Sequence, residues 1–83
     1  MEIEIRKRGF LLYEWRLVPD GAEERQLVDK LGGKPSRDQF SWQWPGGRRG
    51  TINRAKRAWR LAQWQAKSKT DFGPVEIVDL PPP

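Results

Sequence analysis

The first eighteen residues alternate between apolar and polar side chains with a period of two. Large apolar residues hold odd positions and charged residues hold most even ones: Ile3, Ile5, Leu11, Tyr13, Trp15 and Leu17 against Glu2, Glu4, Arg6, Arg8, Glu14 and Arg16. Such alternation is typical of a strand with one buried face. A two-residue turn at Arg8-Gly9 would move Ile3 and Ile5 to the side of Leu12 and Glu14. We therefore expect one long strand over residues 1–18, bent or bulged at Gly9. Phe10 and Leu12 interrupt the alternation.

A helical period replaces the strand period in the second half of the chain. With an advance of 100° per residue, five apolar residues fall within a stripe of about 80°: Ile52, Ala55, Trp59, Ala62 and Ala66. The small alanines let such a helix lie close to the surface on which it packs. The glycine-rich stretch before it reads as a loop, and Thr51 is the expected N-cap because its hydroxyl can accept a backbone N–H of the first turn.

Three shorter segments complete the expected secondary structure. Residues 22–31 follow a Pro-Asp-Gly turn and fit either a helix, with acids in the first turn and glycine past the end, or the second strand of a hairpin; we favour the helix. Residues 40–44 alternate aromatic and polar side chains, and residues 75–80 (Val-Glu-Ile-Val-Asp-Leu) are rich in branched apolar residues, so both are expected strands. The fold class is therefore α+β: one domain over residues 1–83, with a small antiparallel sheet of three to four strands, the principal helix packed on it and the short helix at 22–31.

Composition agrees with a compact domain and excludes several kinds of chemistry. Hydrophobic residues make up 36% of the chain and charged residues 33%, which is enough apolar surface for a core. The chain contains no cysteine and no histidine, and its acids are scattered, so we expect no disulfide, no metal site, no cofactor and no enzymatic activity. No stretch is apolar enough to cross a membrane and no signal-peptide pattern is visible, so we expect an intracellular, cytoplasmic protein.

Positive charge is concentrated in one segment. Residues 48–69 contain eight basic residues and no acidic one, whereas the whole chain carries a net charge of +5, so the remainder of the chain carries −3. On the expected helix, the side opposite the apolar stripe gathers Asn53, Arg57, Arg60, Trp64 and Lys67. A localised cationic surface with an aromatic side chain can neutralise phosphates and stack on an unpaired base. The competing interpretation is a merely solvated face, with Trp64 and Leu61 covered by the C-terminal segment.

These features give a main functional hypothesis and two alternatives. The main hypothesis is a non-catalytic nucleic-acid-binding accessory protein that uses the basic loop and helix of residues 46–69, with DNA or RNA as its partner. Glycines and arginines at the helix start also suggest a backbone phosphate contact there. The candidate binding residues are Arg48, Arg49, Arg54, Arg57, Arg60, Trp64 and Lys67.

The first alternative belongs to a different class of function. It is a small inhibitor or adaptor from a phage or mobile element, of the anti-CRISPR kind, whose basic and aromatic face docks on an acidic surface of a host protein, because Trp and Arg are enriched at protein hot spots. The second is a small assembly component whose long first strand pairs with a neighbouring chain. The sequence leaves the oligomeric state open.

Overall fold

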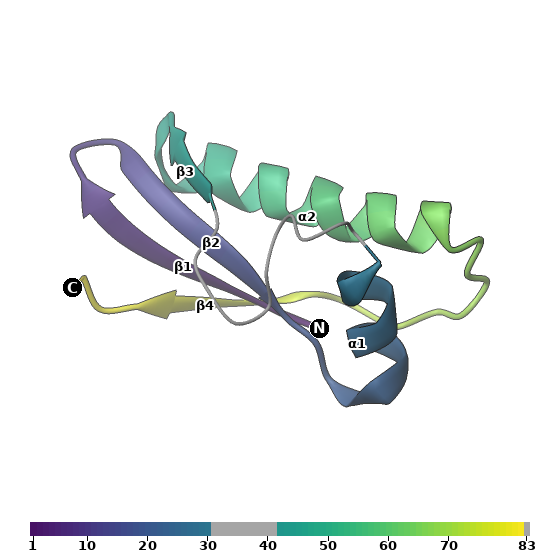
Figure 1. Ribbon diagram of the computed structural model, residues 1–83. Coiled ribbons are helices and arrows are strands. Elements are labelled where there is room, and N and C mark those ends of the chain that lie inside the picture. Colours follow the sequence, from purple (N-terminus) through teal and green to yellow (C-terminus); the bar gives the residue numbers. More distant parts are fainter. Residues whose placement is uncertain (31–41, 83) are drawn as a thin grey trace.

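The computed structural model describes residues 1–30 and 42–82, and they form a four-stranded sheet with two helices. In chain order the elements are β1 (Glu2–Gly9), β2 (Leu12–Val18), α1 (Gly21–Asp29), β3 (Trp42–Pro45), α2 (Gly47–Gln65) and β4 (Glu76–Leu80). The strand order in the sheet is β3-β2-β1-β4. Figure 1 shows α2 running along one face of this sheet, with α1 beside the C-terminal half of α2. The α+β class and the principal helix packed on the sheet are thus confirmed.

The core lies between the sheet and the two helices. Ile3, Ile5, Trp15 and Leu17 supply the sheet side of this core, and all are at most 2% exposed. Ala55, Trp59 and Ala62 supply the α2 side and are also buried, as their helical spacing predicted. The Trp59 ring packs against Phe72 with centroids 5.4 Å apart. One face of α2 is therefore fully used for folding, which leaves the opposite face to solvent.

The expectation of one long strand over residues 1–18 is wrong, because the chain folds back into the β1–β2 hairpin. Residues 10 and 11 form the turn, and the register pairs Ile3 with Leu17 and Ile5 with Trp15. This register keeps odd positions opposite odd positions, so the apolar face is continuous across both strands. A shift in register between Lys7 and Gly9 accommodates the turn. A turn at Arg8-Gly9 is indeed absent, but the turn at residues 10 and 11 satisfies the same alternation of apolar and polar positions.

The sheet is mixed, whereas the sequence predicted an antiparallel one. β1 pairs antiparallel with β2, and β2 with β3, but β4 pairs parallel with β1. The cause is α2, whose 19 residues carry the chain from one end of the sheet back to the other. β4 therefore sets out in the same direction as β3, as in a strand-helix-strand crossover.

The remaining expectations are confirmed with shifted boundaries. The segment at 22–31 is the helix α1, which buries Leu27 and Val28, and residue 31 lies outside the described part. The strand expected at 40–44 is β3, and residues 40 and 41 lie outside the described part; the strand expected at 75–80 is β4.

The N-cap of α2 differs from the prediction. The helix begins at Gly47 with Gly46 as N-cap, so Thr51 lies inside it, fully buried, and donates its hydroxyl proton to the Gly47 carbonyl at 2.9 Å. Gly46 has a φ of 125°, a conformation that a side chain would oppose. The N–H groups of Gly46 and Gly47 both donate to the Leu11 carbonyl, at 3.0 and 3.3 Å. A backbone acceptor from the β1–β2 turn thus takes the place of a capping side chain.

Candidate functional site

The side of α2 that faces away from the sheet is strongly cationic. We call this side the outer face of α2 and define it by Asn53, Lys56, Arg57, Arg60, Leu61, Trp64 and Lys67, the last lying just past the helix end. Every one of these side chains is exposed. Helix α2 contains no acidic residue. Lys56, Arg57, Arg60 and Lys67 form no ion pair with residues 1–30 or 42–82.

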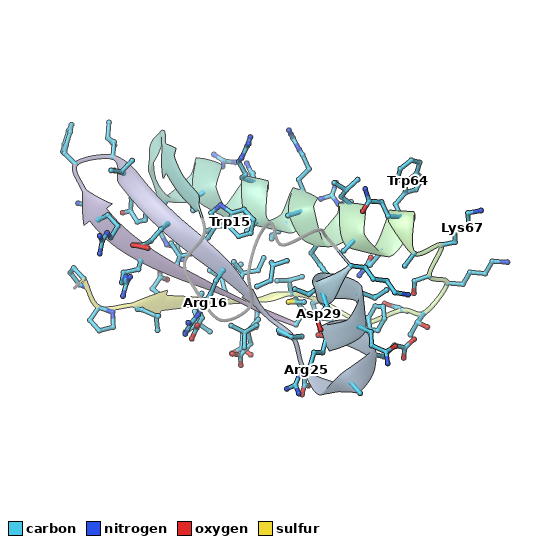
Figure 2. All side chains as sticks on the ribbon, viewed as in Figure 1. Trp15, Arg16, Arg25, Asp29, Trp64 and Lys67 are labelled. Atoms are coloured by element: carbon cyan, nitrogen blue, oxygen red, sulfur yellow. The ribbon has the colours of Figure 1, made fainter. Side chains whose placement is uncertain are left out.

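Trp64 projects from this cationic surface into solvent. Its side chain is 75% exposed, and the neighbouring Leu61 is 44% exposed. Figure 2 shows Trp64 pointing away from the sheet near the C-terminal end of α2, close to Lys67. The C-terminal segment does not cover this indole, since Phe72 packs on the buried Trp59 instead. The ring is therefore available as a planar apolar surface among positive charges.

The end of α2 holds Lys67 in an unusual backbone conformation. The Lys67 N–H donates to the Trp64 carbonyl and the Ser68 N–H donates to the Gln63 carbonyl, both at 3.0 Å. These two bonds are the Schellman pattern, in which the residue at the Lys67 position adopts the left-handed region and is usually glycine. Lys67 has a φ of 53°, so a lysine occupies a position that favours glycine.

The two arginines at the start of α2 have different surroundings. Arg48 makes two hydrogen bonds to the Asp79 carboxylate on β4, Nε to Oδ1 at 2.8 Å and Nη2 to Oδ2 at 2.7 Å. These hydrogen bonds raise the pKa of Arg48 and lower the pKa of Asp79. Arg49 is exposed and forms no ion pair with the described residues. Because Asp79 already neutralises Arg48, a phosphate at the helix start has to displace this carboxylate, and the Gly46 and Gly47 amides are engaged by Leu11.

Other basic residues lie apart from the outer face of α2. Arg6 and Arg8 both approach the Glu14 carboxylate, at 3.2 and 2.9 Å, and Arg16 pairs with Glu4. Arg6, Glu14, Arg16 and Glu4 sit at even positions, so their side chains emerge on the sheet face opposite α2. Arg54 is exposed at the margin of the outer face. The structure thus brings Arg57, Arg60, Trp64 and Lys67 together and separates Arg6 and Arg8 from them.

A second exposed feature lies at the β1–β2 turn and is not among the residues chosen from the sequence. Phe10 is 89% exposed and Leu11 is 51% exposed, the former being the most exposed large apolar side chain of the described residues. Lys7 and Arg8 precede them and are also exposed. In the sequence, Phe10 interrupts the alternation of apolar and polar residues. This interruption indicates an exposed side chain only when the turn is known to lie at residues 10 and 11.

Other kinds of site receive no support from the described residues. No helix among them is long and apolar enough to span a bilayer. Within the same part of the chain no cluster of three acidic side chains is placed to hold a metal ion. An open hollow of about 500 Å³ lies beside the N-terminus, lined among others by Glu2, Asp20, Glu76 and Phe72. Its acidic lining disfavours a phosphate-containing ligand.

Comparisons with protein-family models, with curated proteins and with solved structures found no significant match.

Proposed function

We propose that this protein binds nucleic acid without catalysis, through the outer face of α2. The observation that carries the proposal is the placement of Trp64, 75% exposed, among four cationic side chains that form no ion pair with the described residues. A fold gains nothing from such an arrangement, because the apolar ring is left in water and the like charges repel. A polyanion with planar bases offers partners for both groups.

The charges determine how strongly binding should depend on salt. Five exposed cations along α2 have no acidic partner among the described residues: Arg49 at the helix start and the outer-face residues Lys56, Arg57, Arg60 and Lys67. If each neutralises one phosphate of a single strand, the slope of log K against log salt is about −3.5. Affinity then falls about 100-fold between 50 and 200 mM salt.

Trp64 favours an unpaired strand over a duplex. A base can stack on the indole only when its own face is free, and such a contact contributes about 1–3 kcal/mol. Base pairs in a duplex keep their faces stacked on each other. The expected order of affinity is therefore single strand above duplex, with phosphate contacts from Arg57 and Arg60 common to both.

The test is a titration of tryptophan fluorescence with single-stranded and duplex oligonucleotides at low salt. Trp15 and Trp59 are buried, so quenching by a bound base should come chiefly from Trp64 among the tryptophans whose side chains are described. Trp64→Leu should abolish most of the quenching and reduce single-strand affinity, while duplex affinity changes little. Absence of any response from the unmodified protein at low salt contradicts the proposal.

One observation supports a second candidate function, that of an inhibitor or adaptor that binds a host protein. Leu61 and Trp64 are one turn apart and both exposed, so they form an apolar patch with a cationic border, which suits an acidic protein surface as well. A complex with one protein that survives moderate salt during purification supports this candidate. A complex held mainly by phosphate contacts dissociates under those conditions.

A further inference from the structure

The turn of the β1–β2 hairpin is fixed to the beginning of α2. The Leu11 carbonyl accepts hydrogen bonds from the Gly46 and Gly47 N–H groups, and the Leu11 side chain lies beside Gly47. Leu11 itself has a φ of 55°, in the left-handed region, and the helix start holds it there. Figure 1 shows the turn at the same end of the molecule as the first residues of α2. The backbone of the turn is therefore held at a defined place relative to the helix.

The turn repeats the chemistry of the outer face of α2. Phe10 is an aromatic ring with 89% of its surface in solvent, and Lys7 and Arg49 are exposed cations near the same end of the molecule. Lys7 pairs in register with Tyr13, close to the turn. An exposed aromatic residue with cations is thus present at each end of α2: Phe10 at the start and Trp64 at the finish.

We propose that Phe10 is a second stacking contact and that the ligand is a single strand extending along α2 from Trp64 to Phe10. This inference rests on the proposed function and adds the class of ligand and its length. Gly47 and Trp64 are separated by 17 residues, which at 1.5 Å per residue is about 26 Å along the axis. At a stacked spacing of 3.4 Å per nucleotide this distance corresponds to about eight nucleotides.

The geometry predicts how affinity depends on oligonucleotide length. A 4-nucleotide strand reaches only one of the two aromatic residues, whereas a 12-nucleotide strand reaches both. Affinity therefore rises from 4 to 12 nucleotides and then changes little. If the turn instead contacts a protein or a lipid surface, oligonucleotide affinity shows no threshold in length that depends on Phe10. The same measurement therefore distinguishes those partners of the turn.

The experiment measures the anisotropy of labelled oligothymidylates of 4, 8, 12 and 16 nucleotides with the unmodified protein and with Phe10 variants. Phe10→Leu keeps an apolar side chain but removes the ring, and Phe10→Trp keeps an aromatic face. Because Phe10 is exposed, none of these changes should affect folding, which circular dichroism checks. Phe10→Leu should weaken binding of the 12-mer about 5- to 150-fold, Phe10→Trp should restore it, and the 4-mer should be affected much less.

The outcomes separate this inference from the function on which it rests. If Phe10→Leu binds the 12-mer as well as the unmodified protein does, or if it weakens the 4-mer and the 12-mer equally, the second contact is overturned while nucleic-acid binding by α2 stands. Equal affinity of the unmodified protein for 4 and 12 nucleotides also overturns it. If the unmodified protein binds none of the strands, both proposals fail.

Discussion

Lys67 allows the structural role of a residue to be separated from its proposed binding role. Its φ of 53° places a lysine where the Schellman motif favours glycine. For a residue with a side chain this conformation costs about 1–2 kcal/mol. Glycine escapes that cost but loses about 0.5–1 kcal/mol more backbone entropy on folding. Lys67→Gly should therefore stabilise the fold by about 0.5–1 kcal/mol, which raises the melting temperature by about 2–8 °C for a chain of this size.

The same substitution should weaken binding, because it removes a cation from the outer face of α2. The salt slope should become shallower by about 0.7, the contribution of one phosphate contact on a single strand. Lys67→Gln is the matched control, since it removes the same charge and keeps the left-handed side chain. Thermal unfolding and salt-dependent titration of both variants provide the assay. The reasoning is refuted if Lys67→Gly is no more stable than Lys67→Gln, or if the two variants keep the full salt slope.

Two further predictions concern the surroundings of α2. Asp79→Asn should release Arg48, so binding of single strands tightens and the salt slope steepens by about 0.7. Pairing with Arg48 lowers the pKa of Asp79. The stability contributed by this ion pair is therefore complete above the ordinary aspartate pKa of about 3.9 and is lost as the pH falls through the lowered pKa. The free energy of unfolding should accordingly depend less on pH in the acid range for Asp79→Asn than for the unmodified protein. Ala55→Leu should destabilise the protein by about 1–3 kcal/mol, because Ala55 is fully buried between α2 and the sheet. Gln65→Leu, at an exposed position of the same helix, should not destabilise the protein. Thermal unfolding of the two variants tests this difference.

The principal helix was readable from the sequence because local spacing determines it, whereas residues 22–31 fitted a helix or a strand. The stripe that contains Ala55, Trp59 and Ala62 identified the buried side of α2 and, by exclusion, the outer face with Arg57 and Trp64. The exposure of Trp64 was only one of two interpretations at that stage, since nothing local says whether a later segment covers the ring.

The features that were missed depend on contacts between distant segments. The α2 cap is the carbonyl of Leu11, which no pattern around Thr51 reveals. The direction of β4 follows from the length of the crossover through α2, and the Arg48–Asp79 pair joins residues 31 positions apart. The hairpin was missed because alternation is preserved by any turn whose register pairs odd positions with odd positions, so alternation alone does not locate the turn.

The central claim is that the outer face of α2 binds phosphates, and the salt dependence of single-strand binding tests it most directly. The measurement compares the unmodified protein with Arg57→Ala/Arg60→Ala and with a matched control, Arg25→Ala/Lys30→Ala, which removes two exposed charges from α1 and its C-cap. The account predicts that the slope falls from about −3.5 to about −2.1 in the α2 variant and stays near −3.5 in the control. Equal slopes in the two double variants would contradict the account, because binding would then depend on net charge and not on the outer face of α2.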